Sequence, residues 1–281
     1  MKLFRFGEIG AEKPALLDAD GIGRDLSAHI ADLGPDQLAP DALAAIAAID
    51  PSRLPVVPEG ARLAPCVGNV QRFFCIGLNY IDHASEIGIE PPENPIVFMK
   101  ICDPTGANDP LMLPKGSTHT DWEVELGVVI NQTVRHVSEE KALDMVAGYC
   151  VVNDYSERDF QNNHGGQWVK GKSCDGFGPI GPWLVTRDEV ADPQNLDLWL
   201  DVNGEVQQRG TTARMIFTVP QIIAHLSRFV TLRAGDIITT GTPPGVGMGM
   251  RPQRFLKPGD EVRLGVEGLG EQCQTILPYK E

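Results

Sequence analysis

Apolar and polar positions alternate with a period of two along several short stretches of the chain, and this alternation predicts strands. The clearest case is residues 196–202, where leucines and a valine occupy every second position. The pair Asn203-Gly204 follows, and it suits the two-residue type I′ turn of a β-hairpin. Other strands are expected at residues 3–6, 15–17, 73–76, 121–130, 149–153, 236–240 and 261–266.

Strands and helices are mixed along the chain. Helices are expected at residues 41–49, 80–88, 138–148 and 222–229. Thr218 and Gln221 have capping-box spacing before the last of these. There is no internal repeat and no regular βαβ series, so the pattern predicts a β-rich α+β fold. A proline-punctuated segment, residues 51–58, suggests a small N-terminal α/β domain (residues 1–68) before a main domain (residues 69–281).

The composition says more about the possible partners of the chain than about its fold. The net charge of −14 argues against nucleic acid or an anionic membrane as a partner, and an anionic ligand would need a local cationic site. No apolar run reaches membrane-spanning length, and the first residues lack the apolar region of a signal peptide. The six cysteines show neither CxxC nor zinc-site spacing, so free thiols in a reducing cytoplasm are expected.

Three carboxylates at predicted strands suggest a metal site. Glu123 and Glu125 are two residues apart, which places both on one face with Asp121 in line, and Asp154 follows the apolar residues 149–152. Buried acids are costly unless paired, and oxygen ligands favour a hard ion, Mg²⁺ or Mn²⁺. An edge strand with an acidic face in water, and a strand-end turn at Asp154, would explain the same residues.

Other polar residues could act on a substrate. Lys172 could hold a substrate carboxylate or stabilise an enolate oxygen, and Lys100 offers the same chemistry. His83 and Glu86 are three residues apart on a predicted helix, so the carboxylate could orient the imidazole and either group could deprotonate water. Thr242, in a glycine-rich stretch without a P-loop lysine, could contact substrate. The alternative for the lysines and the His/Glu pair is a solvated surface position.

Taken in order, several stretches resemble the fumarylacetoacetate hydrolase family, from about residue 70 to the C-terminus. They are GLNYIDHA (77–84), NPIVFMK (94–100), DWEVEL (121–126), NDYSERD (153–159), KSCDGFGP (172–179) and TGTP (240–243). The resemblance implies a mixed β-roll core, usually in a homodimer, with residues 1–68 as a variable N-terminal domain.

The resemblance also implies roles for individual residues. An Mg²⁺ or Mn²⁺ ion would be held by Glu123, Glu125 and Asp154, with Lys172 as the site lysine. A mobile lid would carry the catalytic pair His83 and Glu86. Substrate contacts would come from Arg158 and Gln161.

The implied reaction is metal-dependent hydrolysis of a 2,4-diketo acid. Glu86, oriented by His83, would deprotonate a water that attacks C4, and cleavage between C3 and C4 would leave pyruvate enolate, stabilised by the metal and Lys172. The chain length and residues 96–110 resemble a bacterial sugar-acid branch, whose substrates would be 2,4-diketo-3-deoxy-L-rhamnonate or L-fuconate, giving pyruvate and lactate.

Two other classes of function stay open. The first is another metal-enolate enzyme on this scaffold: an oxaloacetate decarboxylase, a 2-hydroxy-dienedioate isomerase or a ureidoglycolate lyase. The second is a non-catalytic module with a structural Ca²⁺ site, in which Lys172 and the His83–Glu86 pair would have no purpose.

Overall fold

A mixed sheet of ten strands runs through the protein. The computed structural model describes the backbone of residues 1–281 and every side chain except that of Ile87. In spatial order the strands of the large sheet are β3 (Gly23–Asp25), β2 (Lys13–Leu17), β1 (Lys2–Phe6), β12 (Leu184–Thr186), β10 (Val146–Asn153), β9 (Val124–Ile130), β15 (Ile237–Thr239), β5 (Phe73–Gly77) and β6 (Ile96–Lys100), with β4 (Leu63–Ala64) paired to β1.

A second sheet and six α-helices complete the fold. The five strands of this sheet are, in order, β14 (Glu205–Thr211), β13 (Asp197–Val202), β16 (Glu261–Val266), β17 (Gly270–Leu277) and β7 (Leu111–Met112). A short pair is formed by β8 (Thr120–Asp121) and β11 (Ser156–Glu157). The helices are α1 (Pro40–Ala47), α2 (Ile81–Ile87), α3 (Glu139–Ala142), α4 (Arg158–Asn162), α5 (Val169–Lys172) and α6 (Val219–Phe229).

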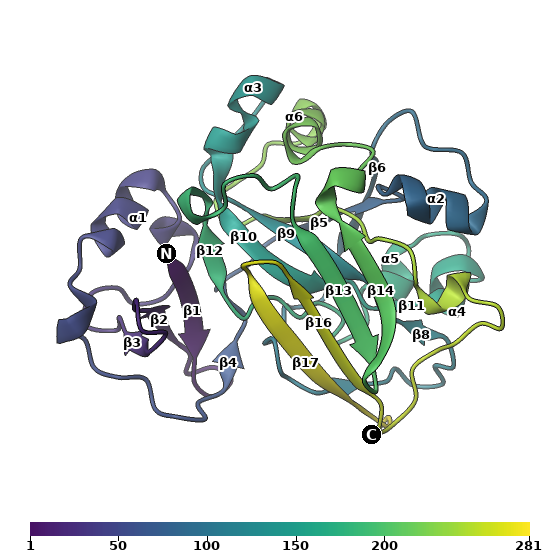
Figure 1. Cartoon of the computed structure of the whole chain (residues 1–281), viewed down its shortest axis with the longest axis horizontal. Helices are drawn as coiled ribbons and strands as arrows, with labels where there is room; N and C mark the ends of the chain where they lie inside the picture. The colour runs from purple at the N-terminus through teal and green to yellow at the C-terminus, as the bar shows by residue number, and fades with distance from the viewer.

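The side chains of β9 show that the large sheet lies between two cores. Leu126 and Val128 pack into a core that also contains Leu200 of β13. Val129 points to the opposite face and packs into a core shared with Leu26 of the N-terminal region. In Figure 1, β13, β14, β16 and β17 accordingly lie in front of β9 and β10. The middle of the large sheet is therefore covered on both faces, which makes it the most protected place in the fold.

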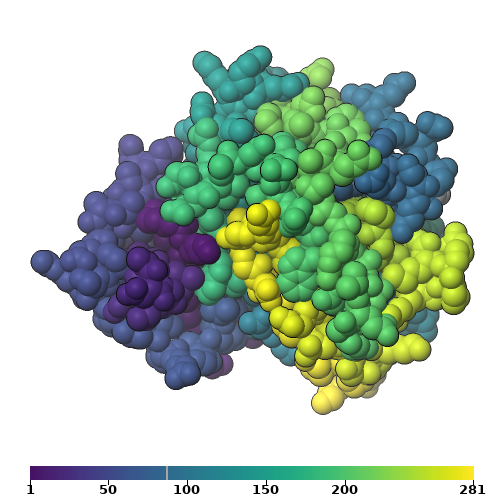
Figure 2. Space-filling view, viewed as in Figure 1, coloured from purple at the N-terminus to yellow at the C-terminus, as the bar shows by residue number. Residues whose placement is uncertain are grey.

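The N-terminal strands extend the large sheet. Lys2 and Leu3 of β1 pair with Val185 and Leu184 of β12. In the space-filling view, this N-terminal region forms the purple and blue lobe at the left of the molecule (Figure 2). The expected domain boundary near residue 68 stays a prediction, since the sheet itself runs across both regions.

The strand-rich α+β class is confirmed, as are several local predictions. The hairpin of β13 and β14 turns at Asn203 and Gly204, whose φ angles of 54° and 75° are those that a type I′ turn requires. Thr218 and Gln221 form both hydrogen bonds of the capping box, and α6 begins directly after Thr218.

The helix expected at residues 138–148 is wrong in its second half. It ends at Ala142, a 3₁₀ turn covers Leu143–Met145, and β10 begins at Val146. All eight residues of β10 are buried, so the strand has no polar face to distinguish it from a buried helix. At Gly148 an added Cβ would lie 2.3 Å from the carbonyl oxygen of Val185, so the close strand pairing needs this glycine.

The single strand expected at residues 121–130 is divided in two. Thr120–Asp121 pairs with β11, and the central strand β9 begins at Val124. The break at Trp122 and Glu123 turns Asp121 away from the other acids, toward a loop near residue 247.

Candidate active site

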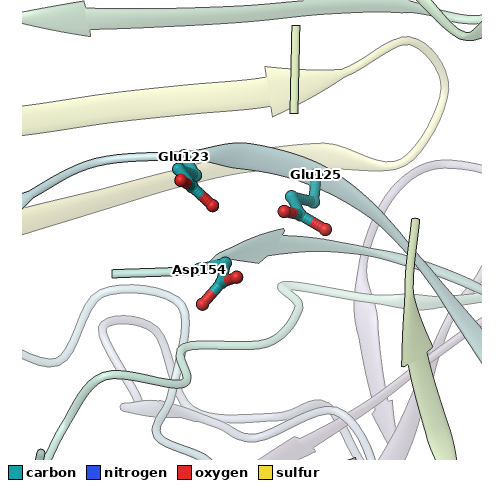
Figure 3. A group of neighbouring side chains, drawn as sticks. All are labelled: Glu123, Glu125 and Asp154. Carbon is teal, nitrogen blue, oxygen red and sulfur yellow. The ribbon is translucent and has the colours of Figure 1, made fainter. Parts of the chain in front are cut away.

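Three carboxylates come together at the ends of two neighbouring strands. β9 and β10 pair antiparallel, with Glu125 opposite Val152. Asp154 follows β10 directly, and its backbone N–H donates to the carbonyl oxygen of Glu123 at 2.9 Å. Figure 3 shows the side chains of Glu123, Glu125 and Asp154 facing one another, and each offers an oxygen within 4.8 Å of the others. This register gathers the three acids that the sequence proposed as metal ligands.

The edge-strand alternative for these acids is wrong. β9 lies between β10 and β15 inside the large sheet, and not at its edge. Glu123 is 6% exposed, Glu125 2% and Asp154 0%. Acids this deeply buried are stable only when cations or hydrogen-bond donors face them, so the surroundings decide what the cluster can do.

Two basic side chains face the cluster from outside the strands. Lys172, the last residue of α5, places its Nζ 2.7 Å from Glu123 Oε2 and 2.8 Å from Asp154 Oδ2. Arg158, the first residue of α4, places its Nη2 2.7 Å from Glu123 Oε1. Both basic residues are almost completely buried, so their attraction to the acids is weakly screened.

Lys100 stands behind the cluster. Its Nζ lies 2.5 Å from Asp154 Oδ1 and donates to the carbonyl oxygens of Tyr155 at 2.9 Å and Lys172 at 2.6 Å. It does not line the cavity described below. The geometry therefore places Lys100 where it holds Asp154 and the end of α5.

The acids differ in their electrostatic surroundings. Burial would raise the pKa of Glu123, but the charges of Lys172 and Arg158 hold it well below its ordinary range. Burial raises the pKa of Glu125 well above its ordinary range, and the charges of Asp154 and Glu123 raise it further. Glu125 is thus the acid whose ionised form most lacks a cation.

The residues present fit a divalent metal ion. Within the described residues, the carboxylate of Glu125 accepts one hydrogen bond, from the backbone N–H of Gly241 to Oε2 at 2.7 Å. A hard cation between the three carboxylates would neutralise the acid that the lysine and arginine leave uncompensated. The oxygen-only donor set suits Mg²⁺ or Mn²⁺ better than zinc.

His83 and Glu86 form the expected pair on α2. The Nδ1 of His83 lies 3.0 Å from Glu86 Oε2, and the other carboxylate oxygen accepts the backbone N–H of Gly245 at 3.0 Å. The backbone of Gly249 also approaches closely, because an added Cβ would lie 2.9 Å from Glu86 Cδ. A loop far along the chain therefore holds the carboxylate against the imidazole.

Asp121 anchors that loop. It accepts hydrogen bonds from the backbone N–H groups of Gly247 at 2.7 Å and Met248 at 3.0 Å. Its Oδ2 also lies 2.8 Å from Arg158 Nε, and Arg158 Nη1 donates to Gln161 Oε1 at 3.1 Å. Asp121 therefore ties Arg158 and Gln161 to the loop, a role that its position in the sequence does not reveal.

A cavity of about 160 Å³ joins the acid cluster to α2. Seven of the residues proposed from the sequence line it: His83, Glu123, Glu125, Arg158, Gln161, Lys172 and Thr242. Glu86 and Asp154 do not line the cavity but contact His83 and Lys172, which do; Asp154 is buried, whereas Glu86 lies at the surface. The structure thus assembles one site from segments spread over 160 residues of sequence.

The hydroxyl of Thr242 is already engaged. It donates to the carbonyl oxygen of Val124 at 2.8 Å and accepts from Gln208 Nε2 at 2.8 Å. Thr242 therefore shapes the cavity wall at the start of β9.

Sequence reasoning missed the apolar part of the wall. Phe98, Trp168 and Met248 line the cavity but look in the sequence like ordinary core residues. The one available signal is their position, because Phe98 and Trp168 each lie within four residues of a proposed site lysine.

The chain is similar to known proteins over most of its length. The model of the fumarylacetoacetate (FAA) hydrolase C-terminal family matches residues 72–277. A Burkholderia lata protein, provisionally named a hydrolase, is 61% identical over 279 residues. The matched region covers 98% of this chain and 98% of that protein. The match region contains every residue of the site described above.

Two solved structures are similar over the whole length of both chains. Maleylpyruvate hydrolase from Sphingobium sp. SYK-6, in complex with manganese(II) and pyruvate, has a TM-score of 0.82 and 28% identity. A Mycobacterium abscessus protein, provisionally named a 2-hydroxyhepta-2,4-diene-1,7-dioate isomerase, has a TM-score of 0.85 and 29% identity. The same fold thus accompanies more than one named reaction.

Proposed function

Since the chain belongs to the fumarylacetoacetate hydrolase family, we propose that this enzyme is a metal-dependent hydrolase of 2,4-diketo acids (acylpyruvates). One observation carries the proposal: two acids of a buried cluster, the lysine at its side and His83, whose ring contacts Glu86, line one small cavity. The structural neighbour named as a maleylpyruvate hydrolase, with manganese and pyruvate bound, supports the same reaction class.

The proposed reaction breaks one carbon–carbon bond with one water molecule. The hydroxyl of water adds to C4, the bond between C3 and C4 breaks, and the electron pair stays on C3 as the enolate of pyruvate. Protonation of C3 then yields pyruvate and a second carboxylic acid. Among the candidate substrates, 2,4-diketo-3-deoxy-L-rhamnonate and L-fuconate would give pyruvate and lactate.

The site residues have two roles in this proposal: some stabilise negative charge and others accept a proton. A bound Mg²⁺ or Mn²⁺, held by Glu123, Glu125 and Asp154, would supply Lewis acidity at the keto acid end of the substrate. Lys172 adds a fixed positive charge where the enolate oxygen develops, and a preorganised charge of this kind is effective in a dry site.

We place the acceptor for the water proton at the His83–Glu86 pair. His83 lines the cavity and Glu86 contacts its Nδ1, so the carboxylate can orient the ring and stabilise its protonated form. The contacts of Glu86 with Gly245 and Gly249 form because α2 lies against the 245–249 loop.

Turnover of acetylpyruvate with Mg²⁺ or Mn²⁺, followed by mass analysis of the products, tests the proposal. Pyruvate and acetate in equal amounts are expected, and Glu123→Gln or Asp154→Asn should abolish turnover while the far-ultraviolet circular dichroism is unchanged. Glu271→Gln, an exposed acid paired with Arg263, is the matched control and should stay active. Full activity in a chelated sample would overturn the metal requirement.

His83→Ala separates hydrolysis from the other reactions of the scaffold. We expect its hydrolysis rate to fall about 100-fold or more, since general base catalysis contributes on this order. His29→Ala, at an exposed position of the N-terminal region, controls for loss of an imidazole.

An isomerase is the second candidate function. The neighbour provisionally named as an isomerase has the higher TM-score of the two structures, at 0.85. In that case a 2-hydroxy-2,4-dienedioate would change its absorbance spectrum without consuming water, and acetylpyruvate would be left intact.

A further inference from the structure

We propose that the site selects acylpyruvates with a short, uncharged acyl group and discriminates against those that carry a second carboxylate. This inference rests on the proposed function and concerns the substrate end away from the metal ligands. The cavity of about 160 Å³ is small compared with ordinary ligand pockets of about 300–1,000 Å³. A small volume makes the nature of its walls decisive for any group beyond C4.

The wall beyond the acid cluster is mainly apolar. Its apolar members are Ile76, Leu78, Ile89, Phe98, Trp168 and Met248, and one polar residue, Asn162, lies beside Met248 with its Nδ2 3.8 Å from the sulfur. Phe98 and Trp168 meet edge to face, with ring centroids 5.4 Å apart. Trp168 also lies so close to Gly77 that an added Cβ would be 2.5 Å from its ring. The two aromatic rings are therefore fixed in place as a hydrophobic surface.

The permanent positive charges of the cavity are bound to its acids, although Lys172 Nζ also lies 5.1 Å from the centroid of the Phe98 ring at the start of the apolar wall. Of the described residues that line the cavity, two carry a permanent positive charge, and these are Lys172 and Arg158. Lys172 contacts Glu123 and Asp154, and Arg158 contacts Glu123 and Asp121. Both cations are thus already paired with carboxylates and lie on the acidic side of the cavity.

The basic residues beside the apolar wall in sequence are bound elsewhere. Lys170, two residues after Trp168, donates from Nζ to the carbonyl oxygen of His164 at 2.6 Å. Arg251, three residues after Met248, donates from Nη1 to the carbonyl oxygen of Met250 at 2.9 Å. A second substrate carboxylate would consequently meet mainly apolar side chains and one neutral amide, that of Asn162, and would lose its hydration without gaining a cation.

A pair of substrates of equal length tests the inference. Butyrylpyruvate ends in a methyl group where succinylpyruvate ends in a carboxylate, so the ratio of their kcat/KM values reports the charge alone. With acetylpyruvate as the reference, we expect kcat/KM for succinylpyruvate to be about 100-fold below that for butyrylpyruvate. Equal values for the two would overturn the inference and leave the hydrolase intact, whereas turnover of no acylpyruvate would overturn both.

Met248→Arg provides the complementary test. This half-buried residue lies at the cavity wall, and a guanidinium there would supply the missing partner for a terminal carboxylate. We expect the succinylpyruvate to butyrylpyruvate ratio of kcat/KM to rise about tenfold. Met112→Arg, an equal change of charge at a methionine that is 43% exposed and outside the cavity, should leave the ratio unchanged. A ratio that rises equally in both variants, or in neither, would contradict the proposed wall.

Discussion

Lys172 is the cation that contacts two of the three clustered acids, at 2.7 Å and 2.8 Å. Burial would lower the pKa of this ammonium, but the charges of Asp154 and Glu123 raise it above its ordinary value, so the lysine stays charged. The side chain therefore offers a permanent positive charge to an oxyanion in the cavity.

Replacing Lys172 with methionine should lower kcat about 100- to 1,000-fold, the range observed when one preorganised stabiliser of an oxyanion is removed. Steady-state kinetics with acetylpyruvate measures the effect. Lys170→Met is a matched control, because Lys170 lies in the same helix but is exposed and bonds a backbone carbonyl. Equal kinetics for the two variants would show that the buried ammonium does not act on the reaction.

At the scale of the element, the 3₁₀ turn Gly247–Gly249 links the two halves of the site. Asp121 holds the turn through two backbone N–H groups, and the loop in turn holds Glu86. This turn explains how the carboxylate of Glu86 on α2 keeps a defined position beside His83.

Gly249→Ala should therefore act on Glu86. The new methyl group would lie 2.9 Å from Glu86 Cδ and push the carboxylate away from His83, so kcat should fall about tenfold or more. Thermal unfolding should change little, since the flexible end of the glutamate can move. Gly34→Ala, where the added Cβ meets its nearest atom at 3.7 Å, serves as the control. Unchanged kcat in Gly249→Ala would contradict the proposed contact between loop and base.

Element prediction succeeded where one face of a strand meets water. β13 alternates buried and more exposed residues, so its period of two is visible in the sequence. It was incomplete for β10, which is buried on both faces and carries no alternation: the strand was expected at residues 149–153, and its first residues, 146–148, were assigned to the preceding helix. The break before β9 was also missed, because the pairing of Asp121 with β11 depends on a distant segment.

The same distinction applies to the site. Glu123, Glu125 and Asp154 stand out in the sequence because acids at strand ends are unusual in a core. They come together because of the register in which β9 pairs with β10, and this register cannot be read from the local sequence pattern. Phe98 and Trp168 remained hidden, because aromatic residues are common in every hydrophobic core.

At the scale of the whole molecule, the acid cluster links stability to pH and metal. The raised pKa of Glu125 means that the folded protein binds this proton more tightly than the unfolded chain does. The proton on Glu125 therefore adds most to the free energy of unfolding at low pH. This contribution is lost as the pH rises from the ordinary carboxyl range through the raised pKa.

Chelator-treated protein should accordingly lose stability across this pH range, by at most about 1.4 kcal/mol per pH unit from this single proton. Glu125→Gln should flatten the slope, and added Mg²⁺ or Mn²⁺ should stabilise the wild type but not the variant. Thermal denaturation at a series of pH values measures both effects. The exposed Glu271→Gln should retain the wild-type slope, and identical slopes in all three proteins would contradict this account.

Other properties of the whole chain need their own measurements. No helix in the part of the chain that the structure describes is long and apolar enough to cross a membrane. The homodimer implied by the family resemblance stays a prediction, and light scattering tests it against the mass of one chain, 30.5 kDa.

The two ends of the cavity belong to parts of the fold with different structural duties. The acids lie at the ends of β9 and β10, which form the middle of the large sheet, so substitutions there that change the side-chain volume would impair folding as well as chemistry. The apolar wall comes mainly from outside these strands, from Phe98 on the edge strand β6, Trp168 before α5 and Met248 in its loop, and only Ile76 on β5 belongs to an inner strand. We therefore expect substitutions in this wall to change which acyl group the site accepts while the acid cluster keeps its geometry, which makes the wall the place at which to redesign the specificity.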